Sequence, residues 1–72
     1  MPGRSRKFGN YLLELRQAKG WTLRDVARVS RLSLTHVWNL EQNNNAPTLT
    51  ALYQLSRAFR LPLSRFVAPL QR

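Results

Sequence analysis

The chain contains no cysteine, one histidine and only three acidic residues. Without cysteine it can form neither a disulfide framework nor a thiolate metal site, and His36 has no second metal ligand at a usual spacing. No acid–base pair or nucleophilic triad can be assembled from so few groups. The three glycines do not form a phosphate-binding loop. We therefore expect a protein that is not an enzyme and that needs no metal and no cofactor.

Long apolar runs are missing as well. No stretch approaches the roughly 18 apolar residues that a membrane-spanning helix needs. The first residues, MPGRSRKFG, are basic but contain no apolar segment of the kind found in secretory signals. We expect no membrane partner and a cytoplasmic location, in association with the nucleoid.

Positive charge is abundant. Twelve Lys and Arg residues give a net charge of +9 and a pI near 11.8, while 43% of the 72 residues are hydrophobic. That apolar content is enough for a folded single domain rather than a disordered polycation. The charge indicates a polyanionic partner, which can be a nucleic acid or an acidic surface.

The segment 22–41, TLRDVARVSRLSLTHVWNLE, predicts two short helices joined by a tight turn. Thr22 is a good N-cap, and Asp25 follows in the first turn, where an acid suits the helix dipole. Ser33 begins the second helix, whose inward side chains are Val37 and Leu40. Two such helices at a steep angle, the second with an exposed face, form a helix-turn-helix arrangement.

The flanking segments complete the expected architecture. A helix over 8–19 ends at Gly20, and Trp21 fills the gap before the next helix. Asn43 or Asn44 takes the left-handed conformation that ends the helix after Ser33. A further helix over 49–59 is capped by Thr48.

The expected inner residues of that later helix are Leu49, Leu52, Leu55, Ser56 and Phe59. Ser64 is expected to cap a last turn. The predicted fold class is all-α, a compact bundle of four helices plus a short fifth. Residues 1–7 are expected to form a flexible basic arm, 8–67 the domain, and 68–72 a short tail.

Several segments together are similar to the Cro/repressor-type (XRE-like, lambda-repressor-like) helix-turn-helix DNA-binding domains. These segments are FGNYLLELRQAKGWT, LRDVA, the S-x-x-x-V-x-x-L-E run of 33–41, NNNAPTLTALYQLSRAF and LPLSRF. The resemblance implies a five-helix bundle with its third helix in the major groove of double-stranded DNA. It also implies a sequence-specific transcription regulator, a repressor in our interpretation, that binds as a homodimer.

The resemblance also assigns residues. It implies base contacts by Leu34, Thr35 and Asn39, to which we add the outward neighbours His36 and Trp38. The residues expected at the DNA backbone are Thr22, Leu23, Arg24, Arg31, Ser33, Asn43, Asn44, Asn45 and Thr48. In the N-terminal arm, Arg4, Arg6 and Lys7 are candidates for phosphate or minor-groove contacts. Arg16 and Glu41 occupy the positions of an internal ion pair.

The sequence departs from the family pattern at three turn positions. Arg31, Asn43 and Arg60 stand where glycine is common. Asn tolerates the left-handed backbone, whereas Arg loses about 1 kcal/mol or more there. At Arg31 we favour a turn of different shape over a strained arginine. Arg57, Arg60 and Arg65 are expected only to add solubility.

The reading face also departs from the pattern, because Leu23 and Leu34 replace commonly polar residues. Leu34 and Trp38 can meet thymine methyl groups, which would favour A·T-rich sites. Alternatively, Leu23, Leu34 and Trp38 form an apolar patch for a protein partner or for dimerisation, as in an antitoxin-like or adaptor module. Trp38 can also fold back into the core. The sequence leaves these alternatives open.

The C-terminal segment LPLSRFVAPL carries more apolar residues than a core cap needs. The dimer interface is therefore expected to use Leu63, Phe66, Val67 and Leu70. A dimer would span two half-sites about 34 Å apart on DNA. A cationic membrane- or RNA-binding peptide is disfavoured, because no helix has a basic face on one side only.

Overall fold

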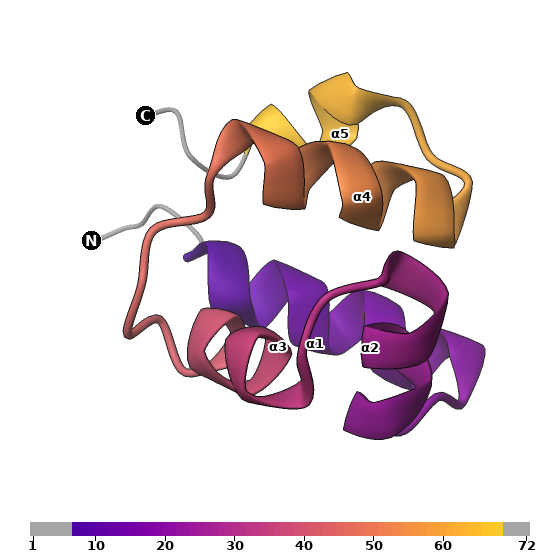
Figure 1. The fold of residues 1–72 in the computed structure, drawn as a ribbon. Coiled ribbons are helices and arrows are strands. Elements are labelled where there is room, and N and C mark those ends of the chain that lie inside the picture. Colours follow the sequence, from indigo (N-terminus) through magenta and orange to yellow (C-terminus); the bar gives the residue numbers. More distant parts are fainter. Residues whose placement is uncertain (1–6, 69–72) are drawn as a thin grey trace.

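The computed structural model describes residues 7–68. Within them all regular secondary structure is helical, as predicted. The helices are α1 (Phe8–Lys19), α2 (Leu23–Ser30), α3 (Leu34–Glu41), α4 (Leu49–Phe59) and α5 (Leu63–Val67). Helix α3 packs against α1 and α2, while α4 packs against α2 and α5. In Figure 1, α4 and α5 lie above the layer formed by the first three helices.

Every helix contributes at least one fully buried side chain to a single core. These side chains are Leu12, Val26, Val37, Leu40, Leu55 and Phe66. Phe66 lies at the centre of an aromatic cluster, with ring centroids 5.6 Å from Tyr11 and 6.1 Å from Phe59. Trp21 is half-buried and its ring lies 5.1 Å from that of Phe59, so the loop after α1 is also tied to α4.

The start of α1 approaches the end of α3 at Gly9. A Cβ at this position would lie 2.5 Å from the carbonyl oxygen of Leu40 and would also overlap that of Glu41. The backbone N–H of Gly9 donates to Oδ1 of Asn43, at 2.9 Å. Asn43 itself has a left-handed backbone, with φ 62°. Glycine on one helix and a left-handed asparagine after the other therefore allow this close contact.

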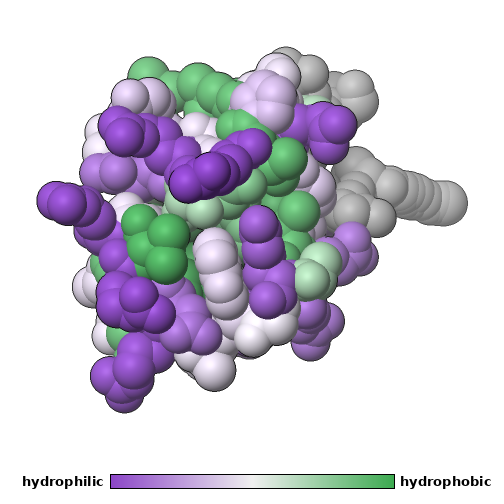
Figure 2. Space-filling model, turned by 90° about the vertical axis from the view of Figure 1, so that its right-hand side faces the viewer, coloured by the Kyte–Doolittle hydropathy of each residue, from purple (hydrophilic) through white to green (hydrophobic). Residues whose placement is uncertain are grey.

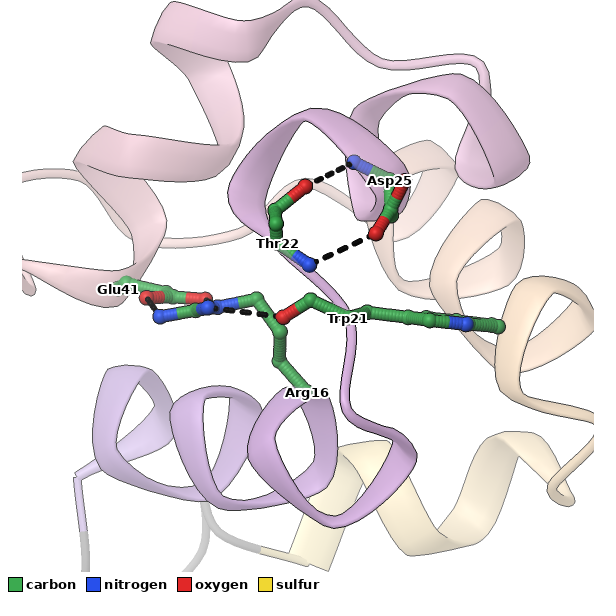
Figure 3. A network of polar contacts seen from close by, with 5 residues as sticks. All are labelled: Arg16, Trp21, Thr22, Asp25 and Glu41. Atoms are coloured by element: carbon green, nitrogen blue, oxygen red, sulfur yellow. Dashed lines mark hydrogen bonds and ion pairs between the residues drawn. The ribbon is translucent and has the colours of Figure 1, made fainter.

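A charged side chain fixes the same pair of helices. Arg16 of α1 donates from Nε to Oε2 of Glu41, at 2.7 Å, and from Nη2 to Oε1, at 3.2 Å. Its Nη1 donates to the carbonyl oxygen of Trp21, at 3.0 Å. Figure 3 shows the guanidinium between these two acceptor groups. The predicted ion pair is present, and its side chains are only 17% and 4% exposed.

Side chains cap the N-termini of both helices of the helix-turn-helix, α2 and α3. Thr22 Oγ1 accepts from the Asp25 N–H, and the Asp25 carboxylate accepts from the Thr22 N–H at 2.9 Å, as Figure 3 shows. The second of these bonds, helped by the Arg28 guanidinium, lowers the pKa of the Asp25 carboxyl below its ordinary value. Ser33 Oγ accepts from the His36 N–H and caps α3.

Three details of the prediction are wrong. Arg31 does adopt the left-handed conformation, with φ 66°, because its N–H and that of Leu32 both bond to the carbonyl of Ala27 to close α2. Leu49, expected in the core, is 71% exposed, because the first turn of α4 places Ala51 and Leu52 in the core instead, at 1% and 5% exposed. The cap residue of α5 is Pro62, and Ser64 lies inside that helix.

We predict that Gly9→Ala destabilises the protein. The gain in helix propensity, at most about 1 kcal/mol, is smaller than the loss from separating α1 and α3, about 1–3 kcal/mol. Urea unfolding followed by circular dichroism measures the change. Gln17→Ala, on the exposed side of α1, is the matched control and should stay within about 0.5 kcal/mol of the parent. An unchanged midpoint for Gly9→Ala would contradict the close contact.

We predict a large loss when the ion pair is broken from one side. Arg16→Met leaves the Glu41 carboxylate buried without its cation and should lower the free energy of unfolding by about 3 kcal/mol or more. The double variant Arg16→Met/Glu41→Leu should recover part of that loss, since no charge is then buried alone. A single variant within about 0.5 kcal/mol of the parent would show that the pair is dispensable.

The capping box makes stability depend on pH in a defined direction. Because the pKa of Asp25 is lower in the folded state, its contribution is fully present above the ordinary carboxyl pKa of about 3.9. It is lost as the pH falls through the lowered value. Unfolding of the parent and of Asp25→Ala should therefore differ by a constant amount near neutral pH and converge on acidification. A pH-independent difference would contradict this role.

Candidate nucleic-acid interface

Helix α3 divides cleanly into a buried and an open side. Val37 and Leu40 are fully buried, whereas Leu34 and Trp38 are 40% and 46% exposed. Thr35 is also exposed. Trp38 is therefore not part of the core, which removes one of the alternatives that the sequence left open. Of the five predicted base-contacting residues, Leu34, Thr35 and Trp38 are exposed on the side of α3 that the bundle does not cover, whereas His36 and Asn39 are half-buried.

Two helices shape a hollow on this side. The first turn of α2 faces the outer side of α3 across a space of about 640 Å³. Its lining residues are Thr22, Leu23, Arg24, Leu34, Thr35 and Trp38. The predicted apolar patch is thus brought together, with two threonine hydroxyls and one arginine at the same site. No carboxylate lines the hollow.

Asn39 is oriented by a neighbour. Its Oδ1 accepts a hydrogen bond from Nδ2 of Asn44, at 3.0 Å. This bond occupies one of the two lone pairs of the amide oxygen and neither proton of the Asn39 amide nitrogen, so the oxygen can accept one further bond while the nitrogen donates. Asn39, a predicted base-contacting residue, is therefore oriented by Asn44, which was predicted to contact the DNA backbone.

The N-terminus of α2 borders the hollow. Its capping box uses the N–H groups of Thr22 and Asp25, which leaves those of Leu23 and Arg24 without an acceptor inside the helix. Such free N–H groups can bind phosphate oxygens. Arg24 is exposed beside them. Of the other predicted backbone contacts, Thr48 caps α4 and Asn43 is bonded to α1.

Arg31 lies apart from this group. It lines a second, more polar hollow of about 570 Å³ between α2 and α4, none of whose residues line the first one. The lining residues are Val29, Arg31, Tyr53, Gln54, Arg57, Ala58 and Arg60. The Arg57 guanidinium lies 5.8 Å from the centre of the Tyr53 ring. On the face drawn in Figure 2, strongly hydrophilic side chains project around smaller hydrophobic areas.

The predicted dimer interface needs one correction. Phe66 is fully buried in the core, so it cannot contact a second copy of the chain. Leu63 and Val67 are half-buried, and Leu70 lies outside the described residues, as do Arg4 and Arg6 of the arm. Helix α4 exposes two large apolar side chains that were not predicted to be exposed: Tyr53, which is 51% exposed, and Leu49. The spacing of these two residues, four apart, was the available signal.

In residues 7–68, no group of three or more His, Cys, Asp or Glu side chains is placed to hold a metal ion. No helix in the same range is long and apolar enough to cross a membrane.

Comparison with known proteins finds matches to most of this chain. A family model described as helix-turn-helix matches residues 12–66. The HTH-type transcriptional regulator SutR of Escherichia coli (strain K12) is 30% identical over 71 residues, or 99% of this chain. The aligned part is 40% of SutR, so the chain spans well under half the length of that relative.

Solved structures agree. The restriction-modification controller protein C.AhdI from Aeromonas hydrophila superposes with a TM-score of 0.79 and 30% identity, over 83% of this chain and 91% of that one. The clp gene regulator ClgR from C. glutamicum gives 0.76 and 25%, over 90% and 84% of the two chains. With a family model over most of its length and relatives of the same kind, this chain belongs to the XRE-type helix-turn-helix family.

Proposed function

We propose that this protein is a sequence-specific transcription regulator that binds double-stranded DNA by inserting α3 into the major groove. The observation that carries the proposal is the open side of α3, bordered by the start of α2. An α-helix with its side chains is about 10–12 Å across, which fits the major groove of about 12 Å width. Thr35 and Asn39 supply hydrogen-bonding groups there, and the free N–H groups of Leu23 and Arg24 would meet a phosphate.

Charge supports nucleic acid as the partner. The net charge of +9 is that of a polyanion-binding domain, and Arg24 stands at the edge of the reading face. If six to ten phosphates are contacted, affinity should fall by about 10³ to 10⁵ between roughly 50 and 200 mM salt. The unit that binds is 8–67, with the basic arm 1–7 as an additional phosphate or minor-groove contact.

We further propose that the protein binds as a homodimer and acts as a repressor. One module of this size buries only about 600–1,000 Å² on DNA, so a second copy on an adjacent half-site would add both affinity and specificity. Surface for self-association is offered by Leu49 and Tyr53 of α4 and by the half-buried Leu63 and Val67 of α5. A dimer bound to its site would then repress transcription by occupying the DNA that other proteins need to bind.

A second candidate function is a protein-interaction module. The apolar residues Leu34 and Trp38 are 40% and 46% exposed, which is unusual for two large side chains on one ridge of a helix. In that case the same face would bind another protein, and base sequence would not matter.

Substitutions on the open side of α3 separate the two functions. Against a duplex selected from a randomised pool, Thr35→Ala and Asn39→Ala should each lose about 1–3 kcal/mol of specific binding while generic binding remains. Arg24→Ala should weaken specific and generic binding alike and reduce the salt dependence by about one phosphate. Fluorescence anisotropy measures all of these affinities.

Arg57→Ala removes the same charge from the second hollow and is the matched control for Arg24→Ala. It should leave specific affinity within about twofold of the parent, apart from a small general effect of net charge. If Thr35→Ala and Asn39→Ala bind every duplex as the parent does, α3 does not read DNA, and the protein-interaction function is favoured.

A further inference from the structure

We propose that the hollow between α2 and α3 recognises the 5-methyl group of a pyrimidine, in thymine or in 5-methylcytosine. The proposal rests on the DNA-binding function proposed above and names the chemical group that the reading face selects. It follows from what lines the hollow, from what the major groove offers, and from the charge around the site.

The hollow is apolar where an amide would be needed to read adenine. Leu23 comes from α2, and Leu34 and Trp38 stand four residues apart on α3, so that three large apolar side chains converge from two helices. Thr22 and Thr35 add methyl groups as well as hydroxyls. A space of about 640 Å³ that is open to solvent and lined in this way leaves apolar surface in water.

The major groove presents very few apolar groups. Guanine shows N7 and O6, adenine N7 and its amino group, and cytosine its amino group; only thymine adds a methyl group, at C5. A polar base edge placed against Leu34 and Trp38 would lose water without gaining a hydrogen bond, which is unfavourable. A 5-methyl group that loses its contact with water there makes binding more favourable, because apolar surface is buried. The apolar lining of the hollow and this one group therefore match in polarity.

The surrounding charge favours a duplex over an apolar protein surface as the occupant. Arg24 lines the hollow itself, no carboxylate does, and the free N–H groups at the start of α2 lie at its edge. An anionic backbone passing beside an apolar base substituent meets both requirements at once. A protein partner would have to combine an apolar side chain with an adjacent anion, and binding of such a protein is the alternative outcome of the test.

A consequence follows for methylated DNA. Methylation of cytosine at C5 puts a methyl group at the same place on the pyrimidine ring that thymine uses. The hollow would therefore accept 5-methylcytosine in preference to cytosine, and binding to a site with cytosine at that position would rise on methylation. The expected contribution of one buried methyl group is about fourfold in affinity.

The test uses the 72-residue chain and duplexes selected from a randomised pool. Each thymine of a selected site is replaced in turn by deoxyuridine, which removes only the methyl group, and affinity is measured by fluorescence anisotropy. We expect a loss of about fourfold at one or two positions of each half-site and none elsewhere. At those positions, 5-methylcytosine should bind about fourfold better than cytosine when both are paired with guanine.

Variants of the protein assign the effect to the hollow. Leu34→Ala and Trp38→Ala change exposed side chains, and in each the ratio of thymine to deoxyuridine affinity should fall towards one. Val29→Ala is the matched control, because Val29 is as exposed as Leu34 but lines the other hollow. In that variant the ratio should stay as in the parent, whereas the double variant Leu34→Ala/Trp38→Ala should bring it closest to one.

The outcomes are distinguishable. Specific binding with no loss at any deoxyuridine, or selected sites that lack thymine opposite the hollow, would overturn the methyl-group proposal and leave the DNA-binding function standing. The same ratio in Leu34→Ala as in the parent would also overturn it. No specific duplex at all would overturn both proposals and point to a protein as the occupant of the hollow.

Discussion

The ion pair between Arg16 and Glu41 is the interaction on which the arrangement of this bundle depends. Its guanidinium bonds to the carboxylate at the end of α3 and to the carbonyl of Trp21 before α2, so one side chain fixes three segments. The Glu41 side chain is only 4% exposed, and a charge buried to that extent needs its partner. With Gly9 allowing α1 to approach α3 closely, the C-terminal end of α3 is anchored and its outer side is left free.

The placement of the reading face follows from this anchor. Val37 and Leu40 are fixed in the core, so Leu34 and Trp38 face outward, and the cap at Ser33 sets where the helix begins. The capping box at Thr22 sets the start of α2 beside them. The structure therefore places the N-terminal turns of α2 and α3 on either side of one hollow. This geometry suits the reading of a groove between two phosphate backbones.

Local signals in the sequence were sufficient for the helices. Caps at Thr22, Ser33 and Thr48 and the glycine after α1 act within one turn. The bounds predicted for the helices over 8–19 and 49–59 agree with the observed ones, and α2 and α3 begin directly after their predicted caps. Arg31 was predicted wrongly because a local penalty was weighed without the two bonds to Ala27 that close the turn. Phe66 was placed in an interface because a short apolar segment does not reveal whether it faces a core or a partner. The convergence of Leu23 with Leu34 and Trp38 was suggested by sequence, but the hollow they form needed the angle between α2 and α3.

The central claim is that the outer side of α3 reads the sequence of double-stranded DNA. Its most direct test is selection of bound sites from a randomised duplex pool at about 150 mM salt, where generic phosphate contacts are weakened. If α3 reads DNA in a dimer, we expect recovery of a defined motif, arranged as an inverted repeat with half-site centres about one helical turn apart. Recovery of no motif, with only generic binding that disappears as salt is raised, would contradict it.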